Sequence, residues 1–275
     1  MSELFSMWRN TRMIVLTAIS ASAYVAVLLP FKGLVIVPGL TEVRPGAAIP
    51  IVLSFLFGPA AAWGAGFGNI IADALGGMLG PGSLFGFAGN FFYGYLPYAI
   101  WRAFMGENNP VRSGLKGWLL FGTILITSCL VIGSVIGWGV DLFRLVPFGA
   151  LGPIIAVNNL IASSAIATVL LALLYERVQI WGLLYFQILQ DKHETSHATI
   201  KENSAPFVGR TQKVGAILCI IGAFLAFVPG MIISCESLGA GYGTAAFASD
   251  AKGTIAVAGG MAPGLLLILL GAILL

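Results

Sequence analysis

The sequence predicts an all-α integral membrane protein, in which a bundle of six transmembrane helices is followed by two additional ones. Hydrophobic residues make up 58% of the chain, charged residues only 9%, and the mean hydropathy is +0.96. These values lie far outside the range of soluble domains. Because a helix needs about 20 mostly apolar residues to cross a hydrocarbon core, the chain has room for about eight spans and no large soluble domain.

The apolar segments follow one another with short polar connections. The first is expected to be a retained helix, since no small-residue cleavage site of a signal peptide precedes it. The second and third are short and are joined through Gly58-Pro59, which predicts a tight hairpin shielded by protein. The predicted spans are Met13–Leu29, Ala47–Phe57, Ala60–Leu75, Leu84–Trp101, Trp118–Val140, Pro147–Tyr175, Val214–Ile233 and Thr254–Leu275.

The basic residues predict the orientation in the membrane. With the N-terminus in the cytoplasm, 10 of the 14 Lys and Arg residues lie on the inner side, and only Lys32, Arg44, Arg144 and Lys252 lie outside. Cytoplasmic loops carry such an excess of positive charge. We therefore expect a multi-pass protein of the plasma membrane with both termini in the cytoplasm, and no nucleic-acid partner.

The longest hydrophilic stretch divides the chain. Residues 190–213 mix both charges with Ser, Thr, Asn and Pro, which is typical of a linker. We expect a six-helix membrane domain at 1–189, a cytoplasmic linker at 190–213 and a transmembrane helix pair at 214–275. Just before the linker, Val178–Leu189 carries Trp181, Tyr185 and Phe186, which suits an interfacial helix or an extension of the sixth span.

One motif in the linker suggests an enzyme. His193, Glu194 and His197 fit the H-E-x-x-H pattern of zinc peptidases. Such a site needs a stable helix, a third ligand and a cleft, but these are the only 2 histidines of the chain. The three cysteines have no metal-ligand spacing either. We interpret the motif as a solvated linker and expect no catalytic residue, metal site or cofactor; an intramembrane zinc peptidase is the least favoured alternative.

Polar residues within the spans indicate a site. A carboxylate near the membrane core is costly and is a functional hypothesis by default. Asp73 lies four residues after Asn69, so both share one helix face. Asn90, Asn158 and Asn159 fall at a similar depth, outside the centre. Asparagines also join helices by hydrogen bonds, but their convergence with Asp73 predicts a pocket open to the outside.

Further residues are candidates for the ligand's surroundings. The loop Phe31–Gly46 is long enough to fold over the pocket, where Glu42 and Arg44 contact either the ligand or each other; a solvated loop is the alternative. Phe91 and Trp63 offer stacking surfaces. Trp63, however, lies near the cytoplasmic end of its predicted helix, where tryptophan is commonly an interfacial anchor.

The sequence resembles a known family along two stretches. These are VRPGAAIPIVLSFLFGPAAAWGAGFGNIIAD at Val43–Asp73 and LGPGSLFGFAGNF at Leu79–Phe91. They are similar to the substrate-binding (S) components of energy-coupling factor transporters, above all to the queuosine-precursor group, over about Arg12–Arg177. The resemblance implies a six-helix fold that captures a small polar organic micronutrient, a vitamin or nucleobase-derived precursor, and works with a membrane coupling subunit and cytoplasmic ATPases.

The resemblance also suggests a partner surface. The first helix of the family often carries an A-x-x-x-A surface, and Ala18, Ser22 and Ala26 repeat at that spacing; contact within the chain is the alternative. No phosphate-binding loop occurs in the sequence, so we expect other chains to hydrolyse ATP. A stand-alone secondary transporter or facilitator using Asp73 is the alternative. The last two spans have no counterpart in the minimal six-helix fold, and the absence of histidine on the outer side disfavours a metal substrate.

Overall fold

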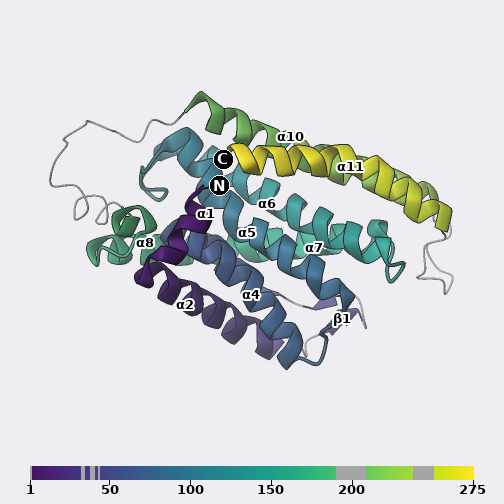
Figure 1. The fold of residues 1–275 in the computed structure, drawn as a ribbon, viewed down its shortest axis with the longest axis horizontal. Helices are drawn as coiled ribbons and strands as arrows, with labels where there is room; N and C mark the ends of the chain where they lie inside the picture. The colour runs from purple at the N-terminus through teal and green to yellow at the C-terminus, as the bar shows by residue number, and fades with distance from the viewer. Residues whose placement is uncertain (1, 32–34, 38–40, 43, 190–208, 238–250) are drawn as a thin grey trace.

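The structure, a computed structural model, describes residues 2–31, 35–37, 41–42, 44–189, 209–237 and 251–275 (Figure 1). Nearly all the described chain is helical, and the remaining regular structure is a short antiparallel pair of strands. The elements are α1 (Ser2–Ser6), η1 (Met7–Arg9), α2 (Thr11–Leu28), η2 (Leu29–Phe31), β1 (Val35–Val37), β2 (Thr41–Glu42), η3 (Pro45–Ala47), α3 (Ala48–Phe57), α4 (Pro59–Leu75), α5 (Pro81–Met105), α6 (Gly114–Leu142), α7 (Phe148–Ala162), η4 (Ser163–Ala167), α8 (Thr168–Ile180), α10 (Arg210–Ser237) and α11 (Ala251–Leu274).

The predicted all-α membrane fold is confirmed. Helices α2, α3, α4, α5 and α6 follow the first five predicted spans, α7, η4 and α8 together form the sixth, and α10 and α11 form the last two. Helix α5 starts earlier than predicted because Pro81 occupies its first turn, where a proline fits without loss of a hydrogen bond. Within the residues that the structure describes, five helical stretches are long and apolar enough to cross a membrane: Thr11–Phe31, Gly114–Leu142, Phe148–Leu189, Arg210–Cys235 and Lys252–Leu274.

The short helix α3 is enclosed by protein. Eight of its ten residues are buried, which is how a segment too short to span the bilayer alone is kept from lipid. The hairpin to α4 turns at Gly58, whose φ of 51° and ψ of −115° suit glycine. Its N–H donates to the Ser54 carbonyl at 2.9 Å, and Pro59 begins α4. The predicted tight hairpin is therefore confirmed.

Helix α5 contains a proline that α3 compensates. Pro97 has no N–H and disturbs the hydrogen-bond ladder of its helix. The Ser54 hydroxyl enters this gap: it donates to the Gly94 carbonyl at 2.6 Å and accepts from the Tyr98 N–H at 3.1 Å. A side chain inserted in this way is a recognised cause of a local bend. It ties α3 to the middle of α5, next to the polar residues described below.

The sixth span ends in a turn. Its middle, η4, is π-helical. After Ile180 the chain turns at Trp181 and Gly182 and becomes helical again at residues 185–189. The Tyr185 ring lies against Tyr98, with centroids 5.2 Å apart. The aromatic stretch predicted at 178–189 is thus a separate segment packed on the end of the bundle.

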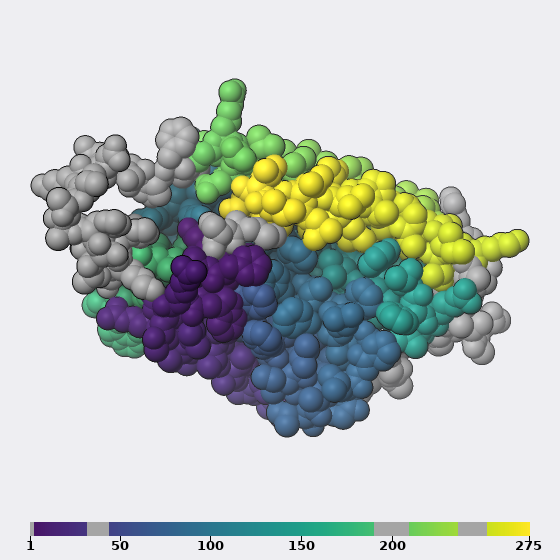
Figure 2. Space-filling model, in the orientation of Figure 1, coloured from purple at the N-terminus to yellow at the C-terminus, as the bar shows by residue number. Residues whose placement is uncertain are grey.

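The C-terminal helix pair is docked along one side of the bundle (Figures 1 and 2). Asp141, at the end of α6 and 1% exposed, accepts from the Phe148 N–H at 3.1 Å and from the Thr254 hydroxyl of α11 at 3.2 Å. Toward the other end of α11, the Tyr95 hydroxyl donates to the Ala272 carbonyl at 3.0 Å. The pair is therefore held at both ends and packs as part of the same helical body.

Candidate functional site

Four side chains from three helices form a hydrogen-bonded chain. The Tyr24 hydroxyl of α2 donates to Asn90 Oδ1 of α5 at 2.8 Å. Asn90 Nδ2 donates to Asn69 Oδ1 of α4 at 3.0 Å and to the Gly86 carbonyl at 2.8 Å. Asn69 Nδ2 then donates to Asp73 Oδ2 at 3.1 Å. The chain thus runs in one direction, from a tyrosine donor to a carboxylate acceptor.

Burial increases along this chain from the carboxylate inward. Asp73 lies near the end of α4 and is partly exposed, whereas Asn69 is 4% and Asn90 0% exposed. Close helix contacts make this possible: a Cβ at Gly86 would lie 2.5 Å from Asn69 Nδ2, and one at Gly68 would lie 2.9 Å from the Tyr24 ring. The glycines therefore leave the space in which polar side chains of neighbouring helices meet.

The loop before α3 lies close to this chain. Arg44 and Asp73 are both near enough to the Tyr24 hydroxyl to act on it electrostatically. Strand β1 pairs with β2, and both β2 and η3 contact α7. Of the described parts of this loop, η3 contacts both α2 and α7, and β2 contacts α7. The side chain of Glu42 lies outside the described residues.

Helix α7 brings two further candidates. Asn159 is 2% exposed and Asn158 is partly buried. Both are on the helix that β2 and η3 contact. They therefore lie on the helix next to the loop that precedes α3, and their part in a site stays a prediction.

The structure places Trp63 and Phe91 in an aromatic cluster apart from the polar chain. Trp63 Nε1 donates to the Leu4 carbonyl at 2.9 Å, and its ring lies 4.9 Å from Phe91 and 5.7 Å from Trp8. Trp63 precedes Asn69 by six residues, about 9 Å along the helix axis. Phe91 follows Asn90 and faces about 100° away from it, since helical residues turn by that angle. Trp63 also contacts Phe5 of the N-terminal segment, whereas the Phe91 ring packs against Trp63, Phe87 and Tyr95.

Tyr24 and the buried residues Tyr93 and Ser163 were not among the candidates from the sequence. The Tyr93 hydroxyl, one turn after Asn90, contacts the hydroxyl of Ser163 at the start of η4 and lies 3.8 Å from Cys129 Sγ. All three residues are buried. A tyrosine in mid-span is a signal that could have been used, because membrane tyrosines gather at the interfaces.

A family model described as QueT transporter matches residues 14–176. This is more than half of the 275 residues. The chain belongs to the QueT transporter family. No curated protein and no solved structure matches significantly.

The QueT match covers the whole polar chain, from Tyr24 to Asn90, together with Arg44 and the asparagines of α7. It stops within α8, before the helix pair α10 and α11. The chain is therefore a multi-pass membrane protein of a family that transports small substrates. The H-E-x-x-H motif lies outside both the QueT match and the described residues, so the peptidase alternative gains no support.

Proposed function

We propose that this QueT-family chain captures a small polar organic micronutrient, a vitamin or a nucleobase-derived precursor, on the outer side of the plasma membrane. The observation that carries the proposal is the series of hydrogen-bonded side chains from Tyr24 through Asn90 and Asn69 to Asp73. Asp73 supplies an acceptor for an N–H or O–H group of the ligand, and Arg44 a donor. Polar groups in a dry site discriminate strongly against ligands that leave them unpaired.

The ligand is expected to enter beside Asp73, at the carboxylate end of the hydrogen-bonded side chains. Asp73 is the most exposed member of the chain, and the segment with Glu42 and Arg44 leads into η3, which contacts both α2 and α7. Closure of this segment would bring Arg44 and Glu42 over a ligand bound at Asp73, with Asn158 and Asn159 on the far wall. If Asp73 faces the outer side of the membrane, both termini lie in the cytoplasm, as the distribution of basic residues favours.

We further propose that other chains supply the energy, a membrane coupling subunit and cytoplasmic ATPases. The exposed face of α2 supports this. Ala18, Ser22 and Ala26 are all exposed, whereas α2 contacts α4 through its opposite face: a Cβ at Gly64 would lie 2.4 Å from Ser20 Cβ. The small-residue stripe is therefore not used for packing within the described chain and is available to a partner helix.

A thermal-shift screen tests the binding proposal. Detergent-purified protein is heated with vitamins and nucleobase derivatives, since a ligand that binds the folded state raises Tm. We expect a stabilising nutrient, and a Kd weakened about 10- to 100-fold in Asp73→Asn, because a charge-assisted hydrogen bond contributes about 1.5–3 kcal/mol. The His193→Ala/His197→Ala variant should bind normally. Zinc stabilisation that needs both histidines, without any nutrient effect, would contradict the proposal.

Substitutions on α2 test the proposed contact with a membrane coupling subunit. In Ala18→Leu/Ala26→Leu, the added side chains block close helix approach, so we expect co-purification of the coupling subunit to fall at least about tenfold. Tm of the isolated chain should stay unchanged because both positions are exposed. Ala256→Leu, at an exposed alanine of α11, is the matched control. Unchanged co-purification, or pH-dependent flux through the chain reconstituted alone, would instead favour a stand-alone transporter that uses Asp73.

A further inference from the structure

The first turn of α7 is capped by side chains from other helices. Pro147, which precedes α7, makes no side-chain cap. Instead the Phe148 N–H donates to Asp141 Oδ2 of α6 at 3.1 Å. The next N–H, that of Gly149, donates to the Ser234 hydroxyl oxygen of α10 at 2.8 Å. The first N–H groups of a helix have no partner within it, so α10 supplies an acceptor that α7 itself lacks.

The second helix of the C-terminal pair takes part in the same contact. The Thr254 hydroxyl of α11 donates to Asp141 Oδ1 at 3.2 Å. Asp141, Ser234 and Thr254 are 1%, 2% and 4% exposed, and Gly149 is buried as well. Withdrawal of the pair would leave the Gly149 N–H without its acceptor, which is costly for a buried group. Both α10 and α11 therefore stabilise the first turn of α7.

The Phe148 side chain is enclosed at the same place. It is 0% exposed and forms a buried apolar cluster with Val257 and Met261 of α11. Its ring centroid lies 5.7 Å from that of Phe227 of α10. A Cβ at Gly230 of α10 would lie 2.8 Å from the same ring, so this glycine leaves the space that the ring occupies. The pair thus contacts the first turn of α7 through its side chain as well as through its backbone.

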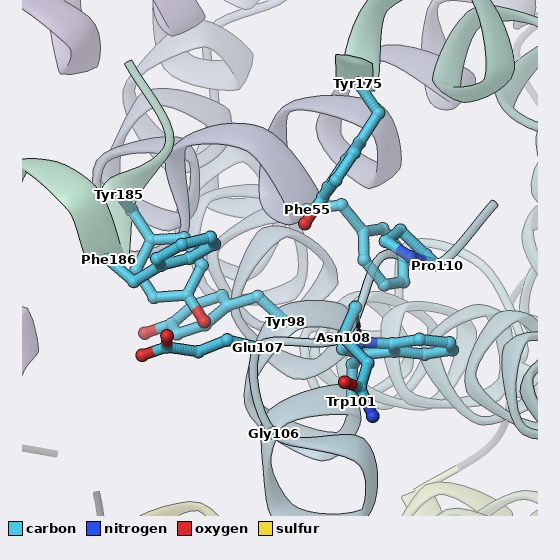
Figure 3. Close-up of a pocket in the computed structure, with 10 residues that line it drawn as sticks. All are labelled: Phe55, Tyr98, Trp101, Gly106, Glu107, Asn108, Pro110, Tyr175, Tyr185 and Phe186. Atoms are coloured by element: carbon cyan, nitrogen blue, oxygen red, sulfur yellow. Dashed lines mark hydrogen bonds between the residues drawn. The ribbon is translucent and has the colours of Figure 1, made fainter. Parts of the chain in front are cut away.

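The opposite end of the same span is fixed by aromatic packing. Figure 3 shows Tyr175 extending from α8 into a small pocket that Phe55, Tyr98 and Trp101 also line. The pocket encloses about 10 Å³, no more than one water molecule needs. Between α7 and α8, Ser163–Ala167 (η4) is π-helical. Because π-helical turns are a recognised cause of kinks and are frequent at functional sites, η4 is where α7 is expected to bend relative to α8.

Helix α7 is also the helix next to the loop that carries Arg44. The segment η3, which directly follows Arg44, contacts both α7 and η4, and β2 contacts α7. Asn158 and Asn159 lie on α7, just before η4. A change in the direction of α7 would therefore move the asparagines and the loop with Arg44 relative to Asp73.

We propose that the C-terminal helix pair is a built-in clamp, which fixes the orientation of α7 and so controls how firmly the site holds its ligand. Ser234 and Thr254 are its positioning residues, because they act through the first turn of α7. The QueT match ends before the pair, so the clamp belongs to the part of the chain that the family model does not cover. Its effect on the ligand rests on the proposed function, whereas the fixing of α7 does not.

Hydrogen–deuterium exchange of the full chain in detergent tests the clamp without a ligand. Ser234→Ala/Thr254→Val removes both hydroxyls and keeps the shape of the side chains. We expect the amides of residues 148–156 to exchange about 3- to 10-fold faster, since two hydrogen bonds between helices are lost. The single variants are measured in parallel, so a misfolded double variant leaves the test intact.

Tyr95→Phe is the matched control. It removes one hydrogen bond between α5 and the pair, to the Ala272 carbonyl near the other end of α11. We expect it to lower Tm without changing exchange at residues 148–156. Unchanged exchange there in the Ser234 and Thr254 variants, or an equal increase in Tyr95→Phe, would overturn the clamp.

Ligand affinity tests the effect on the site. With the nutrient found in the thermal-shift screen, we expect Kd to weaken about 3- to 10-fold in Ser234→Ala/Thr254→Val, mainly through faster dissociation. Kd should be unchanged in Tyr95→Phe, and Thr254→Ser, which keeps the hydroxyl, should bind like the wild type. Faster exchange with an unchanged Kd would overturn the effect on the site, because a merely structural contact changes Tm alone.

The two proposals fail in different ways. If no nutrient binds the wild type, or if binding is the same in Asp73→Asn, the proposed function is contradicted, and exchange at residues 148–156 still decides whether the clamp exists. If a nutrient binds in an Asp73-dependent way and the Ser234 and Thr254 variants behave like the wild type, the clamp alone is overturned.

Discussion

Replacement of Asn90 by leucine is expected to destabilise the protein and to abolish ligand binding. Leucine has the same branched arrangement of side-chain heavy atoms as asparagine but makes none of its three side-chain hydrogen bonds, to Tyr24, Asn69 and Gly86. Interhelical hydrogen bonds in membrane proteins contribute roughly 0.6 kcal/mol each on average. The bonds to Tyr24 and Asn69 are interhelical, whereas the bond to Gly86 lies within α5 and is worth about 0.5–1.5 kcal/mol. We therefore expect a total loss of about 2 kcal/mol in the free energy of unfolding, measured by thermal unfolding in detergent.

The effect on ligand binding should be larger than the effect on stability. Without Asn90, the Asn69 amide loses the partner that fixes its orientation toward Asp73, so the carboxylate end of the chain is no longer held in place. We expect the nutrient-induced rise in Tm to disappear. A binding curve for the ligand found in the thermal-shift screen would show the change directly.

Tyr24→Phe is the matched control for this prediction. It keeps the ring that packs against Gly68 and removes only the hydroxyl that donates to Asn90. The expected cost is about 0.6 kcal/mol, with weakened but measurable binding. If Asn90→Leu and Tyr24→Phe cost the same, the four side chains do not act as a connected chain and the site has been assigned wrongly.

The helices and the polar core of the site follow from the sequence for simple reasons. A lipid-exposed span must be long and apolar, so α2, α6, α10 and α11 stand out. Asp73 and Asn69 share a helix face by their spacing, and the cost of polar groups in a membrane marks them as meaningful. Their bond at 3.1 Å agrees with that spacing.

The partners across helices do not follow from spacing within one helix. Tyr24 reaches Asn90 because Gly64 and Gly68 let α2 approach α4 closely, which depends on packing between distant segments. Trp63 illustrates the converse. The sequence offered it as a stacking surface or an interfacial anchor, but contacts with the N-terminal segment, which no spacing within α4 shows, decide its position. The Tyr98 ring likewise packs against Tyr185, which belongs to a distant segment of the chain.

Replacement of Gly264 by alanine is expected to separate α10 from α11. A Cβ at this position would lie 2.1 Å from the Ala226 backbone nitrogen and 2.5 Å from the Leu225 carbonyl carbon. Backbone atoms within a helix cannot move aside individually, so the whole helix must shift. Overpacking of this kind costs about 1–3 kcal/mol, and more where the backbone is involved. Thermal unfolding should show a clear fall in Tm.

Gly259→Ala, on the same helix, gives the control with the opposite sign. A Cβ at Gly259 meets nothing within 4 Å. Since glycine within a helix is less stable than alanine by roughly 0.5–1 kcal/mol, this variant should be as stable as the wild type or more so. The two substitutions are chemically identical, so a difference in their effects reports the helix contact alone.

The same pair of variants tests how strongly α10 and α11 are tied to the six-helix body. Thr254 of α11 is bound to Asp141, and the Tyr95 hydroxyl of α5 is bound to the Ala272 carbonyl. A shift of α11 forced by Gly264→Ala must therefore strain both bonds, and we expect it to lower Tm for the whole chain in one transition. A separate early transition, with nutrient binding intact, would instead show that the pair folds and opens independently of the site.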